Sequence, residues 1–336
     1  MIQPPPPYTP SDSARRWKQR QRRLLIVLAV LLVLEVALVA RGVMLLGSAG
    51  GTTAQAGQPT ASATATLLPS PTATARPLPS APSIQAAAGM LLDLSANRLL
   101  FQQNAGAQLP MASTTKIMTL LVALKYGRPR LDAPVTIGAD AVVAGQGENS
   151  HMGVSQGEVL SLRDLLYGLM LPSGDDAAVA IADALAGSEP AFVALMNARA
   201  QSLGLTHTRY INSNGLDADG QYTSASDLLR LTAFALDVPD FAEIVSTPEY
   251  IIPATSQHKA YDLQNTNELL GPQGYVGADG VKTGTTGNAG ACLVFSATRG
   301  DAHLLGVLLG DPNDGARYAD ARALLDWGFT AEQEQT

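Results

Sequence analysis

The sequence contains one cysteine, Cys292, and four histidines that stand far apart along the chain. A single cysteine excludes an internal disulfide and a metal site built from several cysteines. Its neighbours, Ala291 to Phe295, form an apolar run, which favours a buried strand residue over a reactive thiol. Because the histidines have no obvious cluster of partner ligands, we expect no metal site and no cofactor.

Two common catalytic signatures are also absent. The sequence has no H-E-x-x-H segment to hold a catalytic zinc ion and no G-x-x-x-x-G-K-[ST] segment to bind nucleotide phosphates. A Ser-His-Asp triad could still be assembled from distant residues, but no pattern singles one out. These absences argue against the metallopeptidase and P-loop classes.

Positive charge is scarce in most of the chain. Residues 84–336 carry 14 Lys and Arg against 27 Asp and Glu, a net charge of −13, whereas the whole chain has a formal net charge of −7. Residues 1–41 are instead basic, with seven cations against Asp12 and Glu35. An acidic domain does not attract a phosphate backbone, so we expect no nucleic-acid partner.

One long hydrophobic run, residues 24–46, directly follows the basic segment 1–23. Such a helix rises roughly 34 Å, enough to cross a hydrocarbon core of about 30 Å. The run contains Glu35, but its many Leu, Ile and Val residues outweigh the cost of one central acid. We expect a single-pass anchor after a disordered cytoplasmic tail (1–23), which places the remaining chain on the extracytoplasmic side of the cell membrane.

A cleaved signal peptide is the alternative, because Ala54-Gln55-Ala56 has the A-x-A pattern of a cleavage site. That site lies well beyond the apolar run, and the run is longer than a usual signal-peptide core. An uncleaved anchor is therefore favoured.

Residues 47–83 are rich in Thr, Ala, Ser, Gly and Pro. This composition cannot bury enough apolar surface to fold, so it predicts a linker. The reach of this linker is between roughly 30 Å as a coil and about 110 Å as extended polyproline II. A folded domain is then expected at residues 84–330, followed by a tail at 331–336.

Hydrophobic periodicity predicts an α+β domain. Residues 90–94 and 98–101 form a predicted β-hairpin, and residues 289–298 and 303–310 form another. Helices are predicted from residue 113 and over further segments with helical spacing: 161–171, 175–186, 189–203, 223–237 and 315–329. Strands at both ends of a helical middle indicate one sheet, completed late in the chain, with helices packed on it.

Ser113-Thr114-Thr115-Lys116 is the first candidate catalytic motif. A hydroxyl and an amine three residues apart lie on one face of a helix, so a neutral lysine could take the serine proton. The helix N-terminus adds positive charge near a developing oxyanion. However, S-x-x-K should occur by chance about once in such a chain, as a helix start with a solvated lysine.

Two later motifs strengthen the interpretation. Ser173 lies in a predicted tight turn between apolar helices, where its hydroxyl could relay a proton. Alternatively, Ser173 or Asp175 could simply cap the next helix. Lys282-Thr283-Gly284-Thr285 places a cation and hydroxyls beside a glycine that permits close approach, which suits a substrate carboxylate. K-T-G should arise by chance only about once in ten or more such chains.

In this order the three motifs resemble the S-x-x-K, S-x-N and K-T-G signature of penicillin-binding proteins and serine β-lactamases. The segments around them narrow the resemblance to the low-molecular-mass D-alanyl-D-alanine carboxypeptidases: Met111–Thr119, Asn212–Leu216, Gly280–Gly290 and Leu324–Phe329. The similarity extends over residues 84–330. It implies the β-lactamase/DD-peptidase-like fold, an antiparallel sheet flanked by helices with a helical subdomain.

The resemblance also implies a reaction on peptidoglycan stem peptides. Ser113 would form an acyl-enzyme with the penultimate D-alanine, Lys116 would be the general base, and Ser173 would protonate the leaving D-alanine. Penicillins would acylate the same serine and inhibit the enzyme. We expect burial and the charge of Lys282 to lower the pKa of Lys116 towards neutrality.

The remaining matched residues would bind substrate. Lys282 and Thr283 would hold the terminal carboxylate, and Arg317, just before the closing helix, is a candidate second partner for it. The backbone N–H groups of Ser113 and Thr285 would form the oxyanion hole.

Asp175 departs from the family pattern, which has Asn at this position. An ionised carboxylate only accepts hydrogen bonds, so Asp175 cannot copy a bond that Asn donates. Its negative charge should also raise the pKa of Lys116, against the role of that residue as a base. We therefore expect slower turnover or altered substrate choice.

Three rival functions remain. A β-lactamase shares the motifs, but the sequence has no clear E-x-x-L-N-like segment to position a deacylating water. A peptidoglycan DD-endopeptidase of the same fold would differ in the cross-link that reaches Ser113. A catalytically weak wall-binding module is supported only by Asp175.

Overall fold

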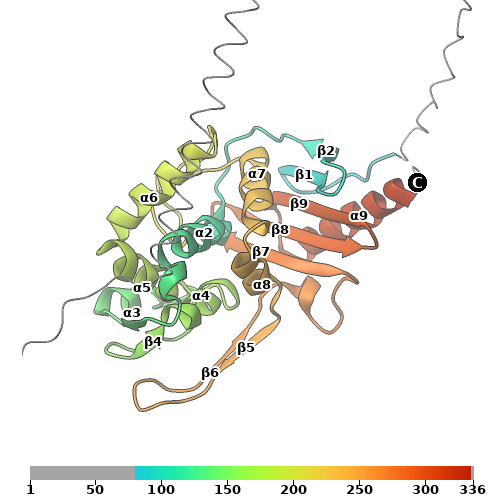
Figure 1. The fold of residues 1–336 in the computed structure, drawn as a ribbon. Helices are drawn as coiled ribbons and strands as arrows, with labels where there is room; N and C mark the ends of the chain where they lie inside the picture. Colours follow the sequence, from blue (N-terminus) through green and yellow to red (C-terminus); the bar gives the residue numbers. More distant parts are fainter. Residues whose placement is uncertain (1–79, 334–336) are drawn as a thin grey trace, which may run out of the picture. The chain divides into compact units, whose positions relative to one another are not determined.

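The computed structural model describes residues 80–333. The predicted tail (1–23), the predicted anchor (24–46), most of the predicted linker and residues 334–336 lie outside this part. Within it, an antiparallel five-stranded sheet packs against helices on both faces (Figure 1). The α+β class is therefore confirmed.

The main sheet is built from strands near the two ends of the described chain: β1 (Ala88–Asp93), β2 (Arg98–Gln103), β7 (Ala278–Thr286), β8 (Gly290–Arg299) and β9 (Ala302–Asp311). Their order is β2-β1-β9-β8-β7, and every neighbouring pair is antiparallel. Because β1 pairs with β9, the late strands complete the sheet that the first hairpin begins, as predicted. Among the described strands only β8 pairs with β7, so β7 is an edge strand.

Helices occupy the middle of the chain and close it: α2 (Lys116–Gly127), α3 (Ala139–Ala144), α4 (Leu162–Met170), α5 (Asp175–Ala186), α6 (Glu189–Ser202), α7 (Ala225–Leu236), α8 (Pro239–Ser246) and α9 (Asp314–Gln333). The predictions of α4 to α7 and α9 are confirmed to within a few residues. α9 continues past residue 330, where the domain was expected to end. In residues 80–333 no single helix could cross a membrane by length and hydropathy; α5 and α6 would do so only as a pair bent by 86°.

Several short elements were not predicted: α3, α8, the 3₁₀ helices η2 (Arg128–Arg130) and η3 (Glu268–Leu270), and the strand pairs β3 (Pro134–Thr136) with β4 (Val159–Ser161) and β5 (Glu249–Ile252) with β6 (Tyr261–Gln264). A three-residue strand such as β3 has too little periodicity to be recognised alone. Its hydrogen bonds to β4 decide its conformation.

The alternation of side chains along the sheet produces two cores. Cys292 and Val294 of β8 point into the larger core, with α2, α7 and α8, whereas Leu293 and Phe295 point into the smaller core beneath α9. Successive strand residues face opposite sides, so a strand covered on both faces is apolar throughout. Cys292 is fully buried and burial raises its pKa to about 11, which confirms the prediction of an inert strand residue.

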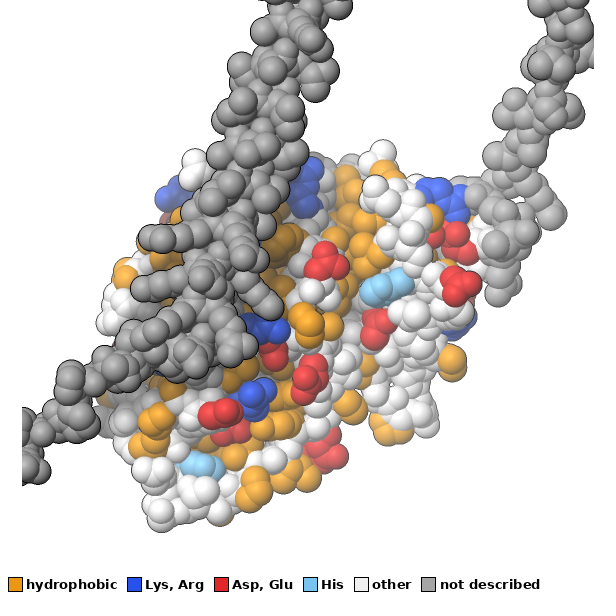
Figure 2. Space-filling view, in the orientation of Figure 1, with side chains coloured by type: hydrophobic (Ala, Val, Ile, Leu, Met, Phe, Trp, Pro, Cys, Tyr) orange, Lys and Arg blue, Asp and Glu red, His pale blue; other side chains and the backbone are white. Residues whose placement is uncertain are grey.

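The surface carries charges of both signs. On the face shown in Figure 2, Lys and Arg side chains lie interspersed with Asp and Glu. The described residues visible on that face show no continuous basic track for a nucleic-acid backbone.

Asp311, at the end of β9, is buried, and its carboxylate oxygens have no hydrogen-bond partner among the described residues. Burial, followed by the charge of Asp320, raises the pKa of Asp311 from 3.8 to about 7. The folded protein then keeps this proton over a pH range where the unfolded chain releases it. The contribution of Asp311 to the free energy of unfolding should therefore fall as pH rises from 3.8 to about 7, and no further above that.

We expect Asp311→Asn to flatten this fall and to raise the free energy of unfolding at pH 8 by about 1–3 kcal/mol, because position 311 then has no carboxylate to ionise. Urea unfolding at pH 5 and pH 8 measures the difference. Asp301→Asn, at an exposed turn, is the control and should behave like the parent protein. An Asp311 variant that keeps the parent's pH dependence would contradict the assignment.

Candidate active site

Ser113 lies in a tight turn that directly precedes α2. The predicted α-helix starts three residues later than expected, because residues 112–115 form the 3₁₀ helix η1 (Ala112–Thr115). Threonine side chains hold this turn by hydrogen bonds back to the main chain: Thr114 Oγ1 to Met111 O (2.6 Å) and Thr115 Oγ1 to Ala112 O (2.9 Å). Ser113 remains partly exposed between buried neighbours, so its hydroxyl is accessible.

Lys116 is fully buried at the first position of α2, one turn after Ser113. Its Nζ lies 2.9 Å from Ser113 Oγ, 2.6 Å from Asp175 Oδ1 and 2.6 Å from the carbonyl oxygen of Asn214. A neutral amine has two hydrogens and one lone pair. It can therefore donate to Asp175 and Asn214 while its lone pair accepts the Ser113 proton.

Burial and the ion pair act in opposite directions on Lys116. Burial lowers its pKa, whereas the charge and hydrogen bond of Asp175 raise it, and burial dominates. Burial likewise raises the pKa of Asp175 against the effect of Lys116. The predicted lowering by burial and raising by Asp175 are confirmed. We expected the charge of Lys282 to lower the pKa of Lys116. Instead, the pKa of Lys282 is lowered, first by burial and then by the charge of Lys116.

Ser173 lies in the loop between α4 and α5 with a left-handed backbone (φ 65°). Its side chain is buried, and its Oγ has no hydrogen-bond partner among residues 80–333. Gly174, rather than Ser173 or Asp175, is the N-cap of α5, and no side chain caps it. The capping alternative is therefore wrong, and the Ser173 hydroxyl is available for a proton transfer.

Asp176 explains how this loop keeps its shape. Its carboxylate accepts four backbone N–H groups: those of Met152 (3.0 Å), Gly153 (2.8 Å) and Val154 (3.1 Å), and that of Ala177 (2.8 Å) in α5 itself. The N–H of Asp175 donates to Ser150 O at 2.8 Å. The segment before β4 thus fixes the start of α5, and with it the position of the Asp175 carboxylate.

The third motif lies on β7, at the edge of the sheet beside η1. A methyl group added at Gly284 would lie 2.9 Å from Ser113 N and 3.1 Å from Thr114 N. Only glycine therefore allows the strand to approach Ser113 this closely. Lys282 is buried, and its Nζ donates to Thr283 O at 3.0 Å.

Arg317, near the start of α9, is buried against the end of this strand. Its Nη1 donates to Gly284 O (3.1 Å), Thr285 Oγ1 (3.0 Å) and Cys292 O (3.4 Å). Its Nη2 lies 3.3 Å from Asp314. Arg317 therefore braces β7 and β8, with its Nη groups engaged by the protein; its contact with a substrate carboxylate stays a prediction.

The segment 212–217 contributes more than the sequence indicated. The carbonyl of Asn214 contacts Lys116, and Gly215 (φ 97°) passes so close to η1 that a Cβ would lie 2.1 Å from Ala112 O. Asp217 accepts from Thr286 Oγ1 (2.7 Å) and Asn288 N (3.1 Å), which ties this segment to the β7–β8 turn. The N-x-x-G-L similarity marked the segment, but a backbone carbonyl leaves no residue signature.

Other nucleophile patterns do not form sites. Ser296 Oγ lies 2.8 Å from His303 Nε2, but Ser296 is fully buried and the same nitrogen faces Asp279, so no relay exists. Residues 153–157 have G-x-S-x-G spacing, yet Ser155 lies in an exposed loop rather than at a strand-to-helix elbow. Within residues 80–333 no group of three His, Cys, Asp or Glu side chains is arranged to hold a metal ion.

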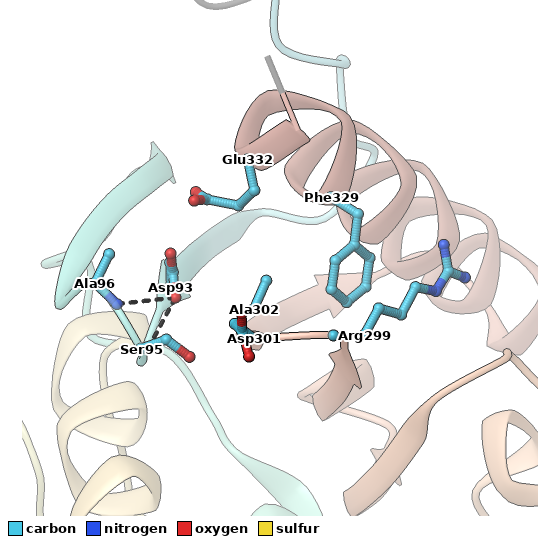
Figure 3. A pocket seen from close by; sticks show the side chains of 9 residues that line it. Asp93, Ser95, Ala96, Arg299, Asp301, Ala302, Phe329 and Glu332 are labelled. Carbon is cyan, nitrogen blue, oxygen red and sulfur yellow. Dashed lines mark hydrogen bonds between the residues drawn. The ribbon is translucent and has the colours of Figure 1, made fainter. Parts of the chain in front are cut away.

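A cavity of about 530 Å³ lies apart from the motifs, among the β1–β2 turn, the β8–β9 turn and the end of α9 (Figure 3). Asp93 there accepts the N–H groups of Ser95 and Ala96, which shapes the turn. None of the lining residues belongs to the three motifs.

Comparison with known proteins identifies relatives of this arrangement. The profile of the peptidase S11 family, described as D-alanyl-D-alanine carboxypeptidase, matches residues 75–313. The chain is 40% identical over 256 residues to DacC of Escherichia coli K12, and 38% identical over 259 residues to DacA of that strain. These matches cover 74% and 75% of this chain but only 62% of each relative.

Solved structures share both the fold and the sequence pattern. The Streptomyces K15 DD-transpeptidase superposes with a TM-score of 0.69 at 34% identity, covering 75% of this chain and 99% of that one. Penicillin binding protein 5 from Haemophilus influenzae gives a TM-score of 0.69 at 34% identity, covering 75% and 72%. The chain has the DD-peptidase fold and belongs to the peptidase S11 family, the D-alanyl-D-alanine carboxypeptidases.

Proposed function

We propose that the protein is a serine D-alanyl-D-alanine carboxypeptidase that removes the terminal D-alanine from peptidoglycan stem peptides. The observation that carries this proposal is the contact of a buried amine, Lys116 Nζ, with the accessible hydroxyl of Ser113 at 2.9 Å. The edge strand β7 runs beside this pair with unpaired main-chain groups, so an extended peptide can add to it as a further strand. The relatives DacC and DacA are named as D-alanyl-D-alanine carboxypeptidases, and the chain matches 62% of the length of each. This similarity supports the proposal.

The proposed acylation begins as neutral Lys116 takes the Ser113 proton and Oγ bonds to the carbonyl carbon of the penultimate D-alanine. The carbonyl oxygen becomes an oxyanion that accepts the N–H groups of Ser113 and Thr285. The C–N bond then breaks, and Ser173 donates its proton to the leaving nitrogen and recovers one from Lys116. These steps leave an ester on Ser113 and a free D-alanine.

Deacylation is the reverse sequence with water as the nucleophile. Lys116 takes a proton from water as the water oxygen bonds to the ester carbon, and returns it to Ser113 Oγ as the C–O bond breaks. Penicillins would form an ester with the same serine as the β-lactam C–N bond breaks, and this ester would hydrolyse slowly. The carboxylate of either ligand would face Lys282 and Thr283.

We also propose that the catalytic domain works on the extracytoplasmic side of the cell membrane, tethered through residues 24–46. The basic residues before this run and the polar linker after it support that orientation. The substrate, the cell-wall peptide, is met on the same side.

A labelled penicillin tests the proposal. We expect the purified protein to gain one covalent label, and peptide mass spectrometry to place it on Ser113. A stem pentapeptide should lose D-alanine, whereas a cross-linked dimer should stay intact. In spheroplasts, a charged penicillin that does not cross membranes should label the protein equally well.

Ser113→Ala is the control. It should take up no label, and its thermal unfolding temperature should equal that of the parent protein. A folded parent protein that gains no label would refute the enzyme assignment. Cleavage of the dimer without release of D-alanine would instead identify a DD-endopeptidase. Labelling only after the spheroplasts are lysed would refute the proposed location.

A further inference from the structure

Thr266 lies outside the three motifs, yet it contacts the third one directly. Its Oγ1 lies 2.7 Å from Thr283 Oγ1, and the two residues come from different segments, the loop after β6 and strand β7. Since Thr283 is the hydroxyl of the K-T-G motif, Thr266 adds a second hydroxyl next to the proposed carboxylate site.

Backbone hydrogen bonds fix the position of Thr266 from two sides. Its N–H donates to Leu171 O at 3.0 Å, two residues before Ser173. Its carbonyl accepts the Tyr318 hydroxyl of α9 at 3.1 Å, and that hydroxyl in turn accepts the N–H of Glu268 at 3.1 Å. Thr266 therefore connects the second-motif loop, β7 and the closing helix.

The contact between the Thr266 and Thr283 hydroxyls is one hydrogen bond, in which one hydroxyl donates its single hydrogen and the other accepts it. If Thr283 donates to Thr266, it presents only lone pairs to a ligand. If Thr266 donates to Thr283, the hydrogen of Thr283 is free. A carboxylate has only acceptors, so it binds to the second arrangement and is disfavoured by the first.

Lys282 is compatible with the same arrangement, because a hydroxyl oxygen can accept two hydrogen bonds. Its Nζ lies 3.5 Å from Thr283 Oγ1, at the long limit of a hydrogen bond, and approaches as a donor. In this arrangement Thr283 accepts hydrogen bonds from both Lys282 and Thr266, and only its own hydrogen remains to bind a ligand.

We propose that Thr266 is a positioning residue for recognition of the substrate's terminal carboxylate: it donates its hydroxyl hydrogen to Thr283 and thereby directs the Thr283 hydrogen to the carboxylate. This inference rests on the proposed carboxypeptidase function. According to this inference, loss of the Thr266 hydroxyl weakens binding of the terminal carboxylate and leaves binding of the acyl part of the substrate unchanged.

A purely structural role for Thr266 makes a different prediction. If the residue only braced β7 against the second-motif loop, its loss would slow every acylation of Ser113 alike. If it orients Thr283, its loss slows only acyl donors that carry the carboxylate.

The test uses two acyl-D-alanyl thioesters with the same acyl part. One has mercaptoacetate as its leaving group, which carries a carboxylate, and the other has the methyl ester of mercaptoacetate. Thr266→Val removes the hydroxyl and keeps the shape, and Thr266→Ser keeps the hydroxyl. We expect the valine variant to lose about tenfold in kcat/KM for the mercaptoacetate substrate, mainly through KM, and less than about twofold for the ester.

The serine variant should recover at least half of the parent's kcat/KM for the mercaptoacetate substrate. Equal losses on both thioesters, or no loss on either, would overturn the inference. If a thermal unfolding measurement shows that the valine variant is not folded, Thr266→Ala is compared with Thr266→Ser in the same way. A parent protein that reacts with neither thioester nor penicillin would refute the proposed function itself, which separates the two failures.

Discussion

Lys116→Met is expected to reduce acylation of Ser113 by about a thousandfold or more. The amine of Lys116 lies 2.9 Å from Ser113 Oγ and is the base that we propose takes its proton. Methionine fills a similar volume but accepts no proton, so Ser113 would have to attack as a neutral alcohol. The second-order rate constant for a labelled penicillin, measured from pH 5 to pH 9, gives the size of the loss.

The same substitution also removes the cation that faces the buried carboxylate of Asp175. Breaking a buried ion pair costs about 3–5 kcal/mol when one charge is left alone, so the single variant is expected to be less stable. Lys116→Met combined with Asp175→Asn removes both charges and should regain much of that stability. The double variant must still fail to acylate; if acylation returns with stability, Lys116 is not the base.

Asp175→Asn is expected to produce the second large effect, a shift of the pH dependence of acylation. Lys116 acts as a base only in its neutral form, so the rate rises with pH through the pKa of this amine. The charge and hydrogen bond of Asp175 raise that pKa. Their removal should move the rising limb to lower pH by about one unit or more, and each unit gives about a tenfold higher rate below the limb.

Asparagine also restores what the carboxylate lacks. Its amide oxygen can still accept the Lys116 N–H, and its NH₂ group can donate to a bound substrate. Turnover of a D-Ala-D-Ala peptide should therefore rise together with acylation at neutral pH. The measurement is kcat/KM against pH for the parent and the variant.

The control is Asp183→Asn, which lies two turns further along α5 and is not among the charges that act on Lys116. It should leave the limb in place. A limb that stays unchanged in Asp175→Asn, or no group titrating below about pH 9 in the parent, would contradict the role assigned to Lys116.

Local sequence patterns identified the elements that carry the site. The alternating and helical spacing of apolar residues predicted the hairpin of β1 and β2 and the helices α4 to α7, since burial of one face fixes the periodicity of the side chains. The start of α2 was misplaced because η1 depends on threonine side chains bonding back to Met111 and Ala112. Propensity alone does not distinguish such a turn from a helix start.

The motifs predicted which residues lie together at the site, but not the hydrogen-bond partners of each residue. Ser113 and Lys116 are three residues apart, so their contact follows from the helical turn. A helix cap was the alternative role for Ser173, and the structure shows instead a buried hydroxyl without a partner in the described residues. The contact of Arg317 with a substrate carboxylate stays a prediction, and the structure adds its hydrogen bonds to Gly284 O and Thr285 Oγ1 at the end of β7.

The sequence by itself predicted Ser113 as the nucleophile, Lys116 as its neighbouring base and the K-T-G segment with its glycine, because each depends on short spacings within one segment. Only the tertiary structure decided the surroundings of Lys116. Asp175 is 59 residues away along the chain, and the Asn214 carbonyl is 98 residues away. The protonation of a buried amine depends on the charges and acceptors that folding brings to it, so the strength of the base is a property of the fold rather than of the motif.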